Sequence, residues 1–552
     1  MNQPRLKSIL WGTAAFALVC GILQPFFQTG FYHDDALNSL LDSYIKTNGW
    51  TFWQFVFQNI GEWLHKNGRF YPFAQIFGYG GWYFFKDLAL YRFTQMALVL
   101  VNILLFMRVL AELGATKNAR LLIGLITLGL FQIRDYHDPI ASYQALLQIL
   151  FLLGMGSILL LLRFKATGKS VFLVSSVGLY ALSLLTYETI LSFFPILIFF
   201  SLRGDKVRGK KALISFGLLL IAFFTMTFWI RTHFPLGYEG TRIGISARFL
   251  TAFLFQMSAT VPLSYAIFGR SGFFKPDHLL YSSLFSWTQL FIFAASAWII
   301  FGLIRKSEKI PAQISRVAML FAGALIVFPS ILVALSSKYQ GEINRPGIGY
   351  LPVYLSYFGM ATLLGLWIVN KVKAVWQSII VSLICALVMT ITVGANTIAV
   401  EKMNQVWRYP RELVEGAARA GLFKGLPEQA LLLHGTRYHP WLRSDYLLEL
   451  SGKNFRPSNY DDWYGGMFAP APFIDGQSVS GTYFLRFDNL ESSQGQIHHG
   501  QVILSEISRI EWDGNRHQVI RILGPGNVRV FSLTNTKGTS AQMDFTGNLL
   551  GL

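Results

Sequence analysis

The chain has 552 residues, of which 53% are hydrophobic and only 14% are charged, and its mean hydropathy is +0.43. Soluble proteins carry about 25% charged residues, so this composition excludes an ordinary water-soluble protein and indicates one that crosses the bilayer several times. Basic residues outnumber acidic ones, 47 against 29, which gives a net charge of +18. Both cysteines, Cys20 and Cys385, lie inside apolar runs, which excludes a disulfide framework.

About eleven apolar runs are candidates for membrane spans, since a span needs about 20 mostly apolar residues. The first run follows Arg5 and Lys7 but lacks a small-x-small cleavage site, so we expect an uncleaved helix rather than a signal peptide. The predicted spans are Ile9–Phe27, Phe93–Met107, Leu121–Ile133, Ala141–Leu162, Val171–Leu185, Thr189–Leu202, Ala212–Ile230, Ser286–Ile304, Val317–Leu335, Tyr350–Val369 and Val375–Ala399.

Basic residues are concentrated in short segments on one side of the predicted spans. These segments are 1–8, 108–120, 163–169, 203–211, 305–316 and 371–373. Together they hold nineteen Lys and Arg residues and three acidic residues, so the positive-inside rule places them in the cytoplasm. The rest of the chain is nearly neutral, and the basic excess is therefore a topology signal rather than a sign of nucleic-acid binding.

The predicted orientation has the N-terminus in the cytoplasm and, with an odd number of spans, the C-terminus outside. The chain contains no Asn-x-Ser/Thr glycosylation acceptor, which favours a bacterial inner membrane over an endoplasmic reticulum.

Large segments fall only on the outer side, at 28–91, 231–285 and beyond residue 400. Within the first, aromatic residues at helical spacing in Trp50–Leu64 and Phe73–Phe85 are typical of interfacial helices, although either could span.

The C-terminal segment changes character after an amphipathic helix predicted at Glu401–Leu422. Prolines punctuate it, and short runs have the composition of strands. These runs are Ala430–His434, Thr482–Phe487, Gln501–Ile507, Gln518–Leu523 and Val528–Leu533. The sequence therefore predicts an all-α polytopic membrane domain over residues 1–400 and a small, β-rich, extracytoplasmic domain over residues 401–552.

An acidic pair, Asp34–Asp35, follows the first predicted span on the outer side. Paired carboxylates at a membrane boundary are costly unless they are solvated, paired or functional. One carboxylate could accept a proton from an attacking hydroxyl while the other orients it or holds a metal. The alternative is that one of the two caps a helix over Ala36–Tyr44.

Two further acidic groups lie in short outer turns. Arg134, Asp135, His137 and Asp138 stand between the third and fourth spans, and Glu188 stands between the fifth and sixth. Asp and Pro are ordinary turn residues, and solvation at the interface would explain Glu188. Two carboxylates, an imidazole and a guanidinium within six residues nevertheless exceed what a turn needs. Because all three acidic groups share one side and depth, we expect an active site on the outer face.

This layout resembles the GT-C class of membrane glycosyltransferases, which use polyprenyl-phosphate-linked sugars and include protein O-mannosyltransferases and lipid A aminoarabinose transferases. The matching features are the acidic pair Asp34–Asp35, the long first outer loop at 28–91, and the acidic turn with Asp135 and Asp138. A soluble outer domain after the last span also occurs in many members. The resemblance covers roughly residues 1–400 and does not extend to residues 401–552.

The resemblance implies transfer of a sugar, with inversion, from a polyprenyl-phosphate donor to a glycan, lipid or protein acceptor. Asp34 or Asp35 would be the general base that activates the acceptor hydroxyl. The residues that would line the same cavity are Asp135, His137, Asp138 and Glu188. Metal dependence differs within the class, so His137 with its neighbouring carboxylates is a candidate site for a divalent metal, and no other cofactor is expected.

A phosphate leaving group needs cations nearby. Arg345 is the first candidate, because it would open the tenth span after a Gly-containing turn, and Arg69 and Lys338 are the others. Each of these could instead bind lipid headgroups at the interface. The expected partners are therefore the sugar donor, the acceptor and membrane lipids, without nucleic acid.

Two alternative functions fit the sequence less well than sugar transfer. A lipid or glycan transporter or flippase would place acids near the middle of its spans, with broken helices and related halves, whereas nearly every predicted span lacks charge at its middle. An O-antigen ligase or polymerase would also act on glycans at the outer face, but those families rely on basic and histidine residues in a large late loop. The chain has no Walker-type loop, Rossmann fingerprint or nucleophile elbow, which argues against a nucleotide-hydrolysing or redox enzyme.

Overall fold

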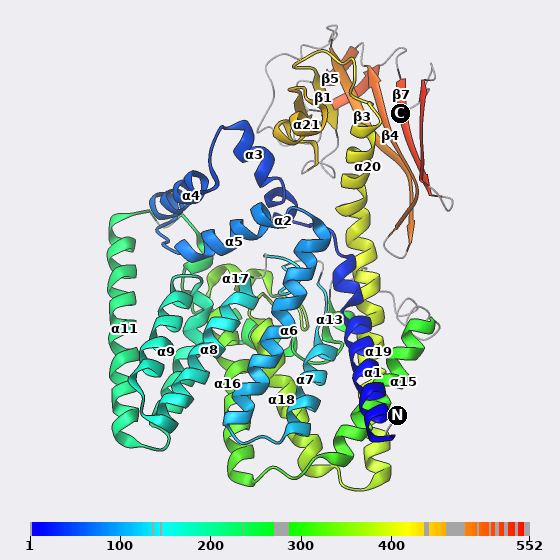
Figure 1. Cartoon of the computed structure of the whole chain (residues 1–552). Coiled ribbons are helices and arrows are strands. Elements are labelled where there is room, and N and C mark those ends of the chain that lie inside the picture. Colours follow the sequence, from blue (N-terminus) through cyan, green and yellow to red (C-terminus); the bar gives the residue numbers. More distant parts are fainter. Residues whose placement is uncertain are drawn as a thin grey trace. The chain divides into compact units, whose positions relative to one another are not determined.

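The computed structural model of the chain is predominantly helical, with a β-sheet region near the C-terminus (Figure 1), and this confirms the predicted fold at that level. The residues it describes are 3–134, 137–143, 146–235, 237–269, 286–434, 441–459, 481–493, 496–506, 509–513, 518–523, 528–535 and 539–545. By proximity of Cα atoms the chain divides into two compact units. We call residues 1–28 and 53–399 the membrane unit, and residues 29–52 and 400–552 the mixed unit.

Eight helices are long and apolar enough to cross a membrane, within the part of the chain that the structure describes. They are α1 (Gln3–Gln28), α6 (Leu88–Glu112), α8 (Leu146–Thr167), α11 (Lys206–His233), α15 (Trp287–Lys306), α16 (Ala312–Leu335), α18 (Val353–Lys371) and α19 (Val375–Val406). These helices make the chain an integral multi-pass membrane protein.

The three remaining predicted spans also coincide with helices, but these are short. Their counterparts are α7 (Lys117–Leu130), α9 (Ser170–Leu184), and the 3-10 turn η1 (Glu188–Phe193) continued by α10 (Phe194–Leu202). At about 1.5 Å per residue, the 14 residues of α7 reach about 21 Å, which is shorter than the hydrocarbon core of about 30 Å. The predicted start of the fourth span, Ala141, is five residues too early, because residues 138–143 form a loop before α8.

Aromatic side chains fill the centre of the membrane unit, where α6, α7, α8, α16 and α18 pack together (Figure 1). The ring centroid of Phe358 on α18 lies 5.1 Å from that of Phe106 on α6 and 4.1 Å from that of Phe151 on α8. A polar link accompanies them, because the Asn102 side-chain amide donates to the Tyr354 hydroxyl at 2.9 Å. Inside a bilayer, van der Waals contact between such side chains and interhelical hydrogen bonds, rather than removal of apolar area from water, hold the helices together.

The predicted interfacial segments are both helices, α4 (Phe52–Asn67) and α5 (Pro72–Phe84). Figure 1 shows α5 crossing one end of the bundle rather than running alongside its long helices. The Phe73 backbone N–H donates to the carbonyl of Leu185, just past the end of α9, at 3.3 Å. The first outer segment therefore contacts the turn that carries Glu188.

Short helices complete the membrane unit on the predicted outer side. They are η2 (Glu239–Thr241), α12 (Arg248–Ser258), α13 (Ser264–Phe268) and α17 (Ser337–Glu342).

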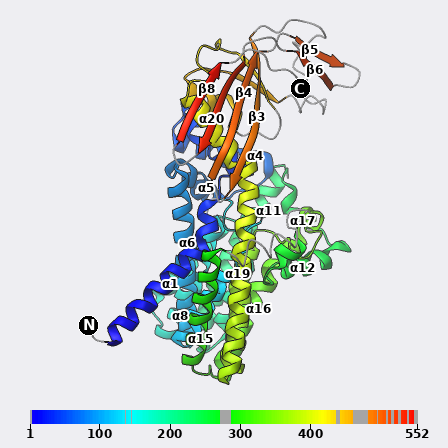
Figure 2. The ribbon, with the colours of Figure 1, turned by 90° about the vertical axis from the view of Figure 1, so that its right-hand side faces the viewer.

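The mixed unit combines helices with a six-stranded sheet of order β2-β1-β3-β4-β7-β8 (Figure 2), in which β1 pairs in parallel with β2 and β3 and the other pairs are antiparallel. A separate hairpin joins β5 and β6. The strands are β1 (Leu431–His434), β2 (Arg456–Asn459), β3 (Thr482–Ser493), β4 (Gln496–Glu506), β5 (Arg509–Asp513), β6 (Gln518–Leu523), β7 (Val528–Asn535) and β8 (Thr539–Phe545). Its helices are α2 (Asp34–Asn38), α3 (Leu41–Thr47), α20 (Arg408–Arg419) and α21 (Ser444–Ser451).

Each of the five predicted strand runs overlaps a strand, whereas β2, β5 and β8 were not predicted. The edge strand β2 contains Pro457 and has no alternating apolar pattern, so its sequence resembles a turn. The predicted helix at Glu401–Leu422 is two helices, since α19 continues to Val406 and α20 begins at Arg408. By proximity of Cα atoms, residues 29–52 group with residues 400–552.

Candidate functional site

Asp34 and Asp35 are the first two residues of α2, a helix of five residues in the mixed unit. The helix cap is His33, so neither acid occupies the cap position of the structural alternative. His33 has φ of 52°, in the left-handed region that favours glycine, and this marks a constrained entry into α2. Asp34 is exposed to solvent, whereas Asp35 is only 1% exposed. Of the two carboxylates, only that of Asp34 is therefore open to solvent.

Contacts within the mixed unit fix the position of this acidic pair. The Gly30 N–H donates to the side-chain oxygen of Asn404 at 2.9 Å. The His33 ring lies 5.1 Å from the ring of Trp407, between α19 and α20. The Arg411 guanidinium donates to the hydroxyl of Ser39 at 3.2 Å. Residues near position 400 thus position α2, although they are far from it in sequence.

The membrane unit contains a buried ion pair between two residues predicted to have separate roles. Both bonds run from Nη2 of Arg69 to the carboxylate of Glu188, at 2.6 and 2.7 Å. The side chain of Arg69 is 9% exposed and that of Glu188 is 28% exposed. Burial alone would lower the pKa of the Arg69 guanidinium, but the Glu188 carboxylate, together with the neighbouring Tyr187 and Tyr71, raises that pKa. Arg69, predicted to bind phosphate, is therefore already neutralised by an acid predicted to line the cavity.

Aromatic rings surround this ion pair and connect it to Lys338. The Arg69 guanidinium carbon lies 4.4 Å from the ring centroid of Tyr238 and 5.0 Å from that of Tyr71. Lys338 Nζ lies 5.3 Å from the same Tyr238 ring. Lys338 also contacts Glu342 at 3.7 Å, a longer separation than that of the buried pair. Two of the three predicted phosphate-binding cations thus lie against one tyrosine.

Tyrosine hydroxyls continue the cluster. The hydroxyls of Tyr238 and Tyr339 lie 3.1 Å apart, and the Tyr339 hydroxyl donates to that of Tyr350 at 2.9 Å. The Tyr350 ring lies 5.3 Å from the ring of His137, whose Nδ1 hydrogen-bonds to the hydroxyl of Tyr143. Burial raises the pKa of both Tyr339 and Tyr350, which keeps their phenols protonated and able to donate. Tyr238, Tyr339 and Tyr350 thus link Arg69 and Lys338 to His137. We call these three tyrosines, together with the charged residues they contact, the tyrosine cluster.

Asp138, predicted to line the cavity, satisfies backbone groups of its own loop. Its carboxylate accepts from the N–H groups of Arg134, Ile140 and Ala141 at 2.8, 2.8 and 2.6 Å, and its side chain is fully buried. Burial raises the pKa of the Asp138 carboxyl, while these N–H groups and the charge of Arg134 act in the opposite direction. Aspartate side chains in turns commonly accept hydrogen bonds from nearby backbone N–H groups. These bonds therefore match the alternative in which Asp138 is a structural turn residue.

The Arg134 side chain is also used inside the fold. It donates to the carbonyl oxygens of Gln132, Ala259 and Ile348 and to the hydroxyl of Tyr357, at 2.8 to 3.1 Å. The guanidinium therefore holds the 134–138 loop against three other segments of the membrane unit.

The remaining predicted residues are placed as follows. Arg345 is exposed in the segment between α17 and α18, eight residues before α18 begins, so it does not open that helix. Asp135 lies outside the described residues. Among the residues that the structure describes, no three His, Cys, Asp or Glu side chains are close enough together to hold a metal ion.

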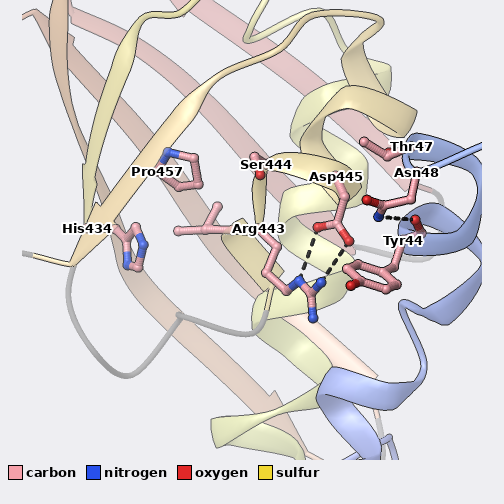
Figure 3. A pocket seen from close by; sticks show the side chains of 9 residues that line it. Tyr44, Thr47, Asn48, His434, Arg443, Ser444, Asp445 and Pro457 are labelled. Carbon is pink, nitrogen blue, oxygen red and sulfur yellow. Dashed lines mark hydrogen bonds and ion pairs between the residues drawn. The ribbon is translucent and has the colours of Figure 1, made fainter. Parts of the chain in front are cut away.

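The mixed unit contains a cavity of about 320 Å³ between α3, β1, β2 and the start of α21 (Figure 3). Arg443 forms a bidentate ion pair with Asp445, with bonds of 3.1 and 2.8 Å. The guanidinium lies 5.6 Å from the ring centroid of Tyr44, and His434 lines the opposite part of the cavity. None of these four residues was predicted, because Tyr44 lies almost 400 positions before the other three and no local motif marks His434, Arg443 or Asp445.

The structure therefore connects Arg69, Glu188, Lys338 and His137 through the tyrosine cluster of the membrane unit. Sequence reasoning missed Tyr238 and Tyr143, which complete the contacts. Tyr238 stands between two glycines in an outer segment, and this local pattern gave no signal for a functional residue.

Comparison with known proteins gives no family assignment, because no protein-family model matches the chain and no curated protein matches it in sequence. What its own residues establish is the class of a multi-pass membrane protein with a C-terminal β-sheet region.

Proposed function

We propose that the protein is a membrane glycosyltransferase that moves a sugar from a polyprenyl-phosphate donor to an acceptor hydroxyl on the outer face. The observation that carries the proposal is the acidic pair in the first turn of α2, six residues beyond the last residue of the apolar helix α1. Asp34 is exposed and Asp35 is buried. The exposed carboxylate could therefore act as the base, and the buried one could hold it in position.

In the proposed reaction the Asp34 carboxylate takes the proton of the acceptor hydroxyl. The hydroxyl oxygen then forms a bond to the anomeric carbon while the bond from that carbon to the phosphate oxygen breaks. Polyprenyl phosphate leaves with the electron pair, and the configuration at the anomeric carbon inverts. Asp35, being buried, has the role of a positioning residue for α2 rather than of the base.

The leaving phosphate gains negative charge and needs a cation. Among the cations of the tyrosine cluster in the membrane unit, Lys338 is less neutralised than Arg69. Glu188 lies 2.6 Å from Arg69, whereas Glu342 lies 3.7 Å from Lys338, whose side chain is 30% exposed. The protonated hydroxyls of Tyr339 and Tyr350 add neutral donors. Arg345, exposed nearby in sequence, is a second candidate cation.

The test is transfer from a panel of synthetic polyprenyl-phosphate monosaccharides in membranes that contain the protein, with released polyprenyl phosphate as the readout. General-base catalysis contributes about 10²–10⁴-fold, so Asp34→Asn should lower the rate at least about 100-fold. Asp42→Asn is the matched control, since Asp42 lies in the same 29–52 segment and pairs with Lys46 at 2.7 Å. A wild-type rate in Asp34→Asn would exclude the proposed mechanism, whatever the rate of Asp35→Asn.

A further inference from the structure

A second cavity of about 350 Å³ lies at the opposite end of the membrane unit from the predicted outer loops. The ends of α6, α8 and α10 and the start of α16 enclose it. The polar or charged lining residues are Glu112, Lys165, Arg203 and Gln313, and the apolar ones are Leu113, Leu162, Phe200, Ile314 and Val317. These helix ends carry the basic connections that the positive-inside rule assigns to the cytoplasm.

The charges around this cavity favour an anion. Lys165 and Arg203 line it. Arg108 and Arg163 lie beside its lining residue Glu112, and Arg208 donates to the carbonyl of Lys165. The carboxylates beside these cations are those of Glu112 and Asp205. Glu112 is held by Arg108 at 2.8 Å and lies 3.9 Å from Arg163. Asp205 pairs with Arg208 at 3.2 Å. Both acids are therefore paired, and a cationic excess remains.

Two of the cations have capacity to bind a ligand. The Lys165 ammonium donates to the carbonyls of Ser201 and Asp205 at 2.8 and 2.6 Å, which uses two of its three N–H groups. Arg203 is exposed, and its guanidinium lies 5.6 Å from the ring of Phe199. Within the described part of the chain, Arg203 has no carboxylate at ion-pair distance. A phosphodiester is the anion that an arginine fork and a lysine bind well.

We infer that this cavity binds the headgroup of an anionic phospholipid of the inner leaflet. The phosphodiester contacts Arg203 and the third N–H of Lys165, and the acyl chains pass the apolar lining toward Leu202, which is exposed beside Arg203. Basic pockets between membrane helices on the cytoplasmic side suit such lipids. A choline or ethanolamine headgroup brings its own cation close to Arg163 and Arg208, so zwitterionic lipids are disfavoured.

The test measures lipid binding to the purified full chain in nanodiscs of phosphatidylcholine with increasing phosphatidylglycerol, using a spin-labelled phosphatidylglycerol. The wild type should hold one such lipid at least tenfold more tightly than spin-labelled phosphatidylcholine. Arg203→Ala should weaken this preference at least tenfold, and Lys210→Ala, which removes an equal charge from the nearby start of α11, should change it less than twofold.

Three results would overturn the inference. They are equal affinities for the two lipids, an Arg203→Ala variant that behaves like Lys210→Ala, or displacement of the lipid by millimolar inorganic phosphate, which would assign the site to a free anion. Arg203→Ala carries the test because Arg203 is exposed, whereas Lys165 also caps carbonyls at the end of α10 and its removal would disturb the fold.

Discussion

The ion pair between Arg69 and Glu188 allows a sharp prediction, because its two partners are buried to different degrees. Removing Glu188 leaves a guanidinium that is 9% exposed, whereas removing Arg69 leaves a carboxylate that is 28% exposed and accessible to water. The two single substitutions should therefore have unequal costs, although they break the same pair of hydrogen bonds.

Breaking a buried ion pair by removing one partner costs about 3–5 kcal/mol. For Glu188→Ala we expect about 3 kcal/mol, the low end, because the aromatic rings of Tyr238, Tyr71 and Trp63 lie within 5.3 Å of the guanidinium carbon and partly stabilise its charge. For Arg69→Met we expect about 1.5 kcal/mol, the value of a hydrogen bond to a charged group, since water can solvate Glu188 and the methionine packs among the rings.

Reversible unfolding of the purified protein in mixed detergent micelles measures these free energies. The double variant Arg69→Met/Glu188→Ala should be more stable than Glu188→Ala alone, because it leaves no buried unpaired charge. The exposed pair of Lys66 and Glu62 on α4, 3.5 Å apart, is the control, and Glu62→Ala should cost less than about 0.5 kcal/mol. Equal costs for the two single variants, or a double variant no more stable than Glu188→Ala, would refute the reasoning.

Variants at three further positions test local features of the membrane unit by the same unfolding assay. Asp87→Ala should cost about 1 kcal/mol and Asp87→Asn much less, because the Asp87 side chain caps α6 by accepting from the Leu90 N–H at 2.9 Å. Asp138→Ala should cost at least about 3 kcal/mol, since it leaves three buried N–H groups without their acceptor at about 1–3 kcal/mol each, and a cost below about 1 kcal/mol would contradict the turn role. For Glu342, burial raises the carboxyl pKa above its ordinary 4.5 despite the charge of Lys338. The folded state then binds the proton more tightly than the unfolded state, so the free energy of unfolding falls as pH rises above about 4.5. Glu342→Gln should remove the part of this decrease that comes from Glu342. Identical dependence of the unfolding free energy on pH in the wild type and Glu342→Gln would contradict this prediction.

The long helices could be predicted because a span is a local property of composition. Each predicted span overlaps a helix, and each predicted strand run overlaps a strand. Of the missed strands, β2 lacks this local signal, whereas β5 has an alternating polar and apolar pattern over Arg509–Asp513 that sequence reasoning overlooked. The strand β2 contains a proline and lies at the sheet edge, where a neighbouring strand rather than its own sequence determines its conformation.

The candidate site was harder to predict, because its contacts join residues far apart in sequence. Arg69 and Glu188 were each identified by residue type and place, but their pairing across 119 positions was not. Three backbone N–H groups of its own loop donate to the Asp138 carboxylate. These bonds depend on the backbone conformation of the loop, which cannot be inferred from the presence of an acidic residue in the sequence. Residue types indicated where charge is unusual, and only the fold shows which charges are already paired.

The mixed unit has a consequence for biosynthesis, since one part of it is translated near the beginning of the chain and the rest near the end. Residues 29–52 carry Phe31, Tyr32 and Ile45, which are buried in the finished unit. Their partners from residue 400 onward leave the ribosome more than 300 residues later, which at about 5–20 residues per second is a delay of tens of seconds. During that time the segment with the acidic pair exposes apolar side chains and lacks its folded environment. A chain that ends before residue 400 would therefore lack the contacts that Asn404, Trp407 and Arg411 make with residues 30–39, and the acidic pair would lack the environment it has in the full chain.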